Sequence, residues 1–116
     1  MDEMQDKMEK LYEHFHSMLP ERWDSIDTAW KNYLDSNAAD SLDQVRFHLH
    51  KLAGAASTYG FTRIGDTARS LEHALDDCFD QNSLDNQSVQ PQVSPELAQL
   101  QDLIQNCSKI PDEQIF

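Results

Sequence analysis

Apolar residues recur at every third or fourth position along most of this chain, and this spacing limits its fold more than any other feature. The period places apolar side chains on one face of an α-helix, whereas a half-buried strand requires strict alternation of apolar and polar residues. The first segment shows the period most fully, with Met4, Met8, Leu11, Tyr12, Phe15 and Met18. Leu, Ala, Met, Gln, Asp and Glu dominate, while Val and Ile are few, which favours helices. We therefore expect an all-α protein.

Five helices are expected from this period and from residues that favour helix ends. They cover residues 2–18, about 20–36, about 41–58, about 62–80 and about 95–108. Pro20 and Pro95 suit a first helical turn, where the missing N–H of proline loses no hydrogen bond, and Gly60 suits a helix end. The simplest architecture for these helices is an antiparallel four-helix bundle with an additional N-terminal helix.

The length of 116 residues is that of a single domain with one modest hydrophobic core. The core bundle is predicted to span about 20–108. Residues 80–95 are polar, lack a period and contain two prolines, so a flexible loop is expected there. Residues 109–116 are expected to form a tail. The apolar Ile115 and Phe116 at its end suggest a linker to a further domain.

The charge balance excludes several classes of partner. Acidic residues outnumber basic ones by 21 to 9, which gives a formal net charge of −12 at pH 7. Such a charge repels nucleic acid and anionic membrane surfaces, and no apolar stretch approaches the ~20 residues that span a bilayer. The charged N-terminus does not resemble a signal peptide, and two cysteines, Cys78 and Cys107, suit a reducing compartment. We expect a cytoplasmic protein that binds neither nucleic acid nor membrane.

The third predicted helix contains two histidines within the sequence RFHLHKLAGAAS, residues 46–57. At about 100° per residue, one narrow face of this helix is apolar and should be buried. That face consists of Leu42, Val45, Leu49, Leu52 and Ala56. His50 lies about 120° from its centre and should be exposed, whereas His48 lies about 80° away on the other flank and should be half-buried. The two histidines face different ways and lack the i, i+4 spacing of helical zinc sites, so no metal site is expected.

Gly54 and Phe47 lie one turn after and one turn before His50, near its face of the helix. A glycine inside a helix costs about 1 kcal/mol relative to alanine, so Gly54 calls for a reason such as the close approach of a partner. Phe47 points away from the core, and an exposed aromatic beside an exposed histidine suggests an interaction patch. Ala53, with its alanine neighbours, fits close packing between two helices.

Two kinds of enzyme find little support in the sequence. The glycines at 54, 60 and 65 are isolated, so no phosphate-binding loop of a kinase or ATPase is present. No serine or cysteine nucleophile with a positioned base can be identified, which disfavours a hydrolase. A neutral imidazole, however, can itself attack phosphorus and later give up the phosphoryl group. An exposed histidine on a rigid bundle meets that requirement.

The string from His50 to Gly54, HKLAG, followed by Gly60, Ile64 and the SLE that ends at Glu72, resembles the signature of histidine phosphotransfer (HPt) domains. The resemblance extends from residue 46 to residue 72. It implies a helical bundle in which His50 accepts a phosphoryl group from a receiver-domain aspartate, or donates one to it, in a two-component phosphorelay. The receiver belongs to a response regulator or a hybrid histidine kinase and supplies Mg²⁺. This chain would bind no cofactor or metal of its own.

The resemblance also implies roles for residues around His50. Gly54 would give a partner clearance beside the imidazole. Arg46 and Lys51 are expected on or near the exposed side, where either could attract the phosphoryl group, although solubility explains both equally well. Arg69 and Glu72 would approach from the fourth predicted helix, with Glu72 bonding the imidazole and fixing its tautomer.

A partner-docking surface would include Phe47, Ala53 and Ser57. Ala53 departs from the family pattern, since many members have lysine there, able to help neutralise the phosphoryl group. This chain has no lysine at that position, and whether Lys51 or Arg46 takes over its role stays open from the sequence.

Two other readings remain open from the sequence. In the first, the chain is a non-catalytic helical adaptor in which His50 is an ordinary surface residue. In the second, it is the dimerisation domain of an autokinase, which also presents a histidine on a helix. The chain has enough helices to close a bundle alone, which disfavours the second reading and favours a monomer.

Overall fold

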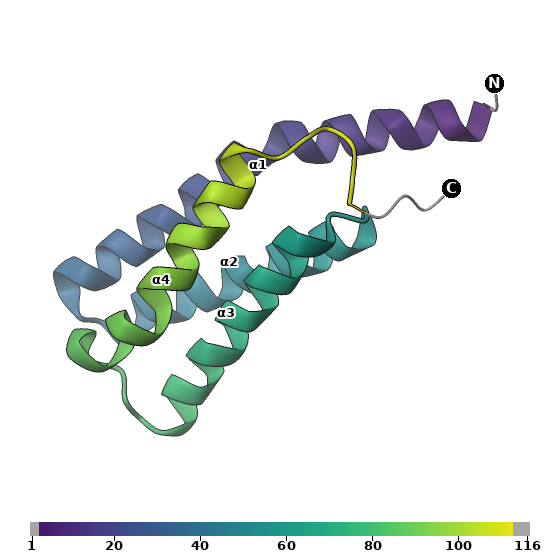
Figure 1. Cartoon of the computed structure of the whole chain (residues 1–116). Helices are drawn as coiled ribbons and strands as arrows, with labels where there is room; N and C mark the ends of the chain where they lie inside the picture. Colours follow the sequence, from purple (N-terminus) through teal and green to yellow (C-terminus); the bar gives the residue numbers. More distant parts are fainter. Residues whose placement is uncertain (1–2, 113–116) are drawn as a thin grey trace.

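The computed structural model describes residues 3–112, which form four α-helices and no strand (Figure 1). The helices are α1 (Glu3–Ser36), α2 (Ala39–Thr58), α3 (Thr62–Asp80) and α4 (Asn86–Gln105). Each helix packs against the next along the chain, and α4 also packs against α1, which closes the bundle. The predicted all-α four-helix bundle is confirmed. The predicted additional N-terminal helix is wrong, because the described part contains four helices and not five.

The missing fifth helix is the first half of α1, which runs from Glu3 to Ser36 with Pro20 inside it. Proline in a helix interior removes one backbone hydrogen bond and costs about 3 kcal/mol. The buried face of α1 continues across the proline nevertheless, since Phe15, Leu19 and Ile26 are all at most 2% exposed. Burying each such side chain contributes about 1.5–3 kcal/mol. Packing on both sides of Pro20 therefore outweighs its local preference for a helix start.

The predicted flexible loop over residues 80–95 is also wrong for most of its length. The connection between α3 and α4 covers only residues 81–85, and α4 begins at Asn86 with both prolines inside it. The Asp85 carboxylate caps the helix by accepting a hydrogen bond from the backbone N–H of Ser88 (3.2 Å). Val89 and Val93, four residues apart, are fully buried. The cap and this short apolar stripe stabilise a helix that the polar composition of the segment does not indicate.

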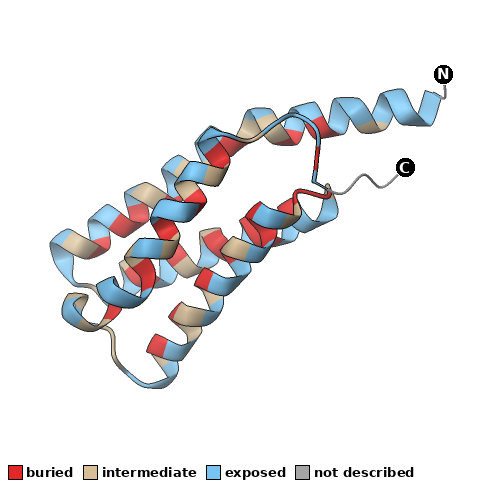
Figure 2. Cartoon of the chain, viewed as in Figure 1, coloured by how far each residue is buried: buried red, intermediate tan, exposed pale blue. Residues whose placement is uncertain are grey.

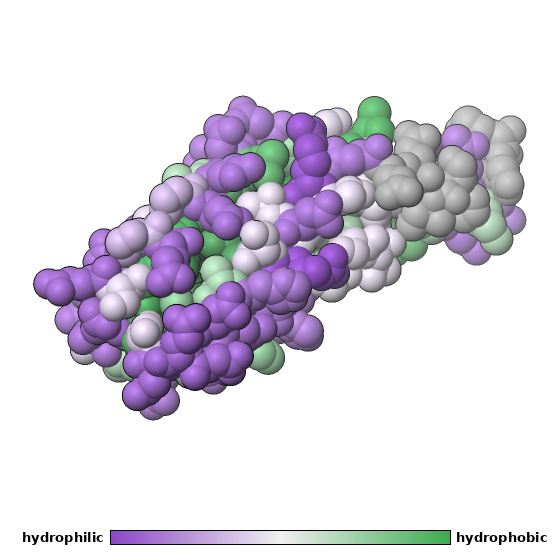
Figure 3. Space-filling view, turned by 60° about the horizontal axis from the view of Figure 1, so that its bottom comes forward, coloured by the Kyte–Doolittle hydropathy of each residue, from purple (hydrophilic) through white to green (hydrophobic). Residues whose placement is uncertain are grey.

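The hydrophobic core lies along the bundle axis, where the inner faces of the four helices meet (Figure 2). The predicted buried face of α2 is confirmed, since each of its five members is 0% exposed: Leu42, Val45, Leu49, Leu52 and Ala56. In space-filling view most of the visible surface is hydrophilic (Figure 3). None of the helices in residues 3–112 has both the length and the apolar composition that a membrane crossing requires.

The segment after α4 packs back onto the start of α3. The backbone N–H of Arg63 donates a hydrogen bond to the Asp112 carboxylate (2.9 Å), and Pro111 is buried. Ile115 and Phe116 lie outside the described residues. The expectation that residues 109–116 lead to a further domain stays a prediction.

Tyr33 joins α1 to the connection between α3 and α4. Its side chain is 0% exposed, and its hydroxyl donates a hydrogen bond to the Leu84 carbonyl oxygen. Burial, together with the negative charges of Asp85 and Cys78, raises the pKa of Tyr33 to about 12. The phenol is thus held neutral well above the pH at which an exposed tyrosine ionises.

We predict that this buried phenol makes the bundle less stable as pH rises from about 10 to about 12. Unfolded Tyr33 loses its proton near pH 10, as an exposed tyrosine does, whereas the folded protein keeps it until about 12. The free energy of unfolding therefore falls over this range. Chemical denaturation at successive pH values should show a steeper fall in the wild type than in Tyr33→Phe, which should lose about 1 kcal/mol at pH 7 with its hydrogen bond. Equal slopes in the two proteins would contradict the prediction.

Candidate functional site

His50 lies on the outer face of α2, opposite the buried stripe, and faces α3. Its side chain is 72% exposed, while the neighbouring Leu49 is 0% exposed. His48 is half-buried, and burial followed by the charge of Lys51 lowers the pKa of its imidazole. The two histidines therefore face different environments, as the helical period predicts.

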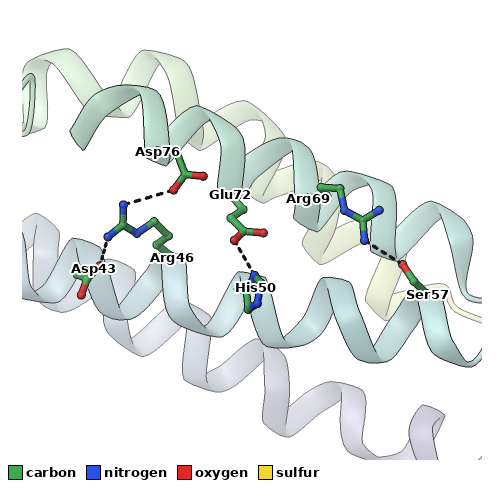
Figure 4. A network of polar contacts seen from close by, with 7 residues as sticks. All are labelled: Asp43, Arg46, His50, Ser57, Arg69, Glu72 and Asp76. Atoms are coloured by element: carbon green, nitrogen blue, oxygen red, sulfur yellow. Dashed lines mark hydrogen bonds and ion pairs between the residues drawn. The ribbon is translucent and has the colours of Figure 1, made fainter. Parts of the chain in front are cut away.

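The His50 imidazole is held by a carboxylate of α3 (Figure 4). Its Nδ1 lies 2.7 Å from Oε2 of Glu72, whose side chain is only 18% exposed. An ionised carboxylate can only accept hydrogen bonds, so Nδ1 carries the proton in this pair. The other ring nitrogen, Nε2, then has a free lone pair when the imidazole is neutral. The contact expected between Glu72 and the imidazole is present.

Gly54 leaves open space beside the imidazole. A Cβ atom added at this position would meet no atom of the described chain within 4 Å, so packing within the bundle does not require glycine there. Gly65 of α3 is different, because a Cβ there would lie 2.9 Å from Oγ of Ser57 and 3.5 Å from the Ala53 carbonyl oxygen. Gly65 and the alanines thus permit α2 and α3 to approach closely, whereas the missing side chain of Gly54 makes room for no atom of the described residues.

Ala53 does not lie on the exposed surface. Its side chain is 2% exposed and belongs to the core cluster. The prediction that Ala53 contributes to a docking surface is therefore wrong, since α2 turns this position toward the interior. Close packing of helices, which the sequence also suggested for Ala53, is its observed role.

Arg46 is bound to two carboxylates rather than free beside His50. Its guanidinium donates to Asp43 (2.6 Å) and to Asp76 of α3 (3.3 Å), and lies 4.1 Å from the centroid of the Phe79 ring. In Figure 4 it points along α2 away from His50. Asp43 could have been found from its i, i+3 spacing to Arg46. Asp76 and Phe79 were missed because they are distant in sequence and meet Arg46 only once α3 packs on α2.

The remaining predicted site residues lie on the exposed faces of α2 and α3. Phe47 is 53% exposed, and the Lys51 ammonium lies 5.3 Å from the centroid of its ring. Arg69 donates a hydrogen bond to Oγ of Ser57 (3.4 Å), further along the same helix pair (Figure 4). Lys51 and Arg69 are thus the most exposed basic groups of the predicted set, and Arg69 also pairs with Asp66 of α3 at 4.0 Å.

The acidic groups near His50 do not form a metal centre. Asp43, Glu72 and Asp76 line the same open hollow as His50, together with Arg46. Over residues 3–112, however, no three histidine, cysteine or carboxylate side chains are arranged to hold a metal ion. Two of these carboxylates bind the Arg46 guanidinium and the third binds the imidazole.

Comparison with known proteins gives one finding. The sequence model of the Hpt domain family matches residues 10–109, which is most of the chain. No curated protein and no solved structure matches it.

We predict that adjacent substitutions on α2 will differ sharply in their effect on stability. Replacing exposed His50 with glutamine should change the free energy of unfolding by less than about 1 kcal/mol, since it removes one exposed polar contact. Replacing buried Leu49 with alanine should cost about 2–5 kcal/mol through lost burial and a cavity. Urea denaturation followed by far-UV circular dichroism measures both. A large loss in His50→Gln would show that His50 belongs to the core.

Proposed function

Because the chain belongs to the Hpt domain family, we propose that it is a histidine phosphotransfer protein in which Nε2 of His50 carries the phosphoryl group. Hpt domains are phosphotransfer modules of two-component systems and interact with receiver domains. The observation that carries the assignment to Nε2 is the hydrogen bond between Nδ1 and Glu72 (2.7 Å), which leaves Nε2 as the unprotonated nitrogen. The 72% exposure of this side chain makes it accessible to a partner.

The transfer needs no separate acid or base from this chain. The Nε2 lone pair attacks the phosphorus of a receiver aspartyl phosphate, the N–P bond forms, and the P–O bond breaks with its electron pair passing to the aspartate carboxylate. The imidazole gains positive charge during attack, and the Glu72 carboxylate offsets that charge through Nδ1–H. The same steps in reverse return the phosphoryl group to a receiver.

The receiver partner brings the divalent cation for this reaction. Phosphoryl transfer depends on in-line positioning and on neutralising the phosphoryl oxygens, for which Mg²⁺ on the receiver is the main source. On this chain, Lys51 and Arg69 are exposed near the histidine face, Arg69 in a long ion pair with Asp66 (4.0 Å), whereas Arg46 is paired with two carboxylates. Phe47, Ser57 and the open space over Gly54 form the docking face in this proposal. We place the protein in the cytoplasm as a monomer.

We predict that incubation with a phosphorylated receiver domain and Mg²⁺ labels the chain with acid-labile, alkali-stable phosphate. His50→Gln should abolish the label without changing the helical circular dichroism. His48→Gln is the matched control, because it removes a histidine two residues away, and it should retain the label. Label that survives in His50→Gln would reject the site. Receiver binding without any label in the wild type would favour the helical adaptor, for which exposed Phe47 would be the anchor.

We predict that Gly54→Ala makes the fold more stable but slows phosphoryl transfer. The added methyl group meets no atom of residues 3–112 within 4 Å, so the better helix propensity of alanine should raise the free energy of unfolding by about 0.5–1 kcal/mol. The same methyl group would crowd the partner at the imidazole, and overpacking of this kind costs about 1–3 kcal/mol, which slows transfer at least about fivefold. Denaturation and timed labelling measure the two effects. Unchanged transfer in the more stable variant would show that the partner does not approach over Gly54.

A further inference from the structure

Three contacts between α2 and α3 share one antiparallel register. Arg46 pairs with Asp76, His50 with Glu72, and Ser57 meets Gly65. Four residues forward on α2, from 46 to 50, match four residues back on α3, from 76 to 72. Likewise, seven residues forward on α2, from 50 to 57, match seven residues back on α3, from 72 to 65. The polar contact at the imidazole thus lies between an ion pair one turn away and a close helix approach two turns away.

The ion pair one turn from His50 is held more firmly than its exposure suggests. Besides Asp76, the Arg46 guanidinium binds Asp43 on its own helix at 2.6 Å and stacks on the Phe79 ring of α3 at 4.1 Å. The Arg46 side chain is 31% exposed. Because the Phe79 ring already orients the planar guanidinium against α3, less side-chain freedom is lost when Arg46 binds Asp76.

We propose that Arg46 is a positioning residue that holds α3 in register with α2, so that Glu72 stays against Nδ1 of His50. Asp76 and Glu72 are one turn apart on α3, as Arg46 and His50 are on α2, so rotation or sliding of α3 that separates one pair separates the other. Arg46 thereby keeps Nε2 as the unprotonated, outward nitrogen. The consequence for transfer rests on the proposed function. This role replaces direct attraction of the phosphoryl group, for which the doubly paired guanidinium has no free charge.

The test compares two alanine substitutions, each of which removes one of the two carboxylates that pair with Arg46. Asp76→Ala removes the ion pair of Arg46 with α3 and leaves the Phe79 contact, whereas Asp43→Ala removes only the ion pair within α2. The readout is the ratio of the two neutral imidazole tautomers of His50, from ¹⁵N chemical shifts of the full, unphosphorylated chain at about pH 8.5. Because both tautomers are neutral, the ratio responds to the Glu72 contact more than to a lost charge nearby. Glu72→Ala removes the contact with Nδ1 itself and therefore gives the largest change in the tautomer ratio that is expected.

Asp76→Ala should lower the proportion of the Nδ1–H tautomer, with the ratio changing about two- to fivefold, the range for an exposed ion pair. Asp43→Ala should leave the ratio as in the wild type. Arg46→Met should reproduce the effect of Asp76→Ala, and the double variant should add nothing further. Labelling by a phosphorylated receiver should slow by the same factor in Asp76→Ala and not in Asp43→Ala.

An unchanged tautomer ratio in both Asp76→Ala and Arg46→Met overturns the inference. So does Arg46→Met with the wild-type ratio and transfer slowed more than about tenfold, since Arg46 would then act on the phosphoryl group itself. Failure of the proposed function looks different, because the wild type would then take up no label. The tautomer ratio, measured without a receiver, decides the positioning role in either case.

Discussion

Burial of the apolar face of α2 decides where the His50 imidazole points. Five side chains of this helix are 0% exposed, and each of the four that are leucine or valine contributes about 1.5–3 kcal/mol. A helix advances about 100° per residue, so fixing the direction of Leu49 also fixes the direction of His50. The exposure of the imidazole is therefore a consequence of the core and needs no local interaction. Exposed polar contacts, worth about 1 kcal/mol or less, act only within the rotation that the core has set.

The same reasoning applies to α3 and the Glu72 carboxylate. Leu71, the residue before Glu72, is 0% exposed, and so are Ala68 and Leu75. These side chains turn Glu72 toward the junction with α2, and Gly65 lets the two helices approach closely. The two apolar stripes bring His50 and Glu72 within reach, and the polar contacts on either side set the fine alignment. His50 thus lies on a helix surface, in an open hollow rather than an enclosed cavity.

The sequence predicted correctly those features of the structure that depend on a single helix. The direction of His50 and the buried face of α2 follow from helical period, and both were predicted. Pro20 was misread because burial of side chains on either side of it depends on the other helices. Residues 80–95 were misread because Val89 and Val93 form too short a stripe to stand out in a polar segment. The Asp76 partner of Arg46 lies 30 residues away, so only the packing of α3 on α2 reveals it.

In the proposed function, the charges around His50 leave most of the neutralisation of the phosphoryl group to the receiver. Asp43 and Asp76 both bind Arg46, and Glu72 binds the imidazole, so three carboxylates face one guanidinium and one imidazole and the hollow keeps a net negative charge. Position 53, where many HPt domains resembling this one have lysine, is a buried alanine that helps α2 pack on α3. A phosphoryl group on Nε2 would add about two negative charges beside these carboxylates. In the proposed function this chain orients the nucleophile, and neutralisation of the phosphoryl oxygens falls mainly to the cation on the receiver.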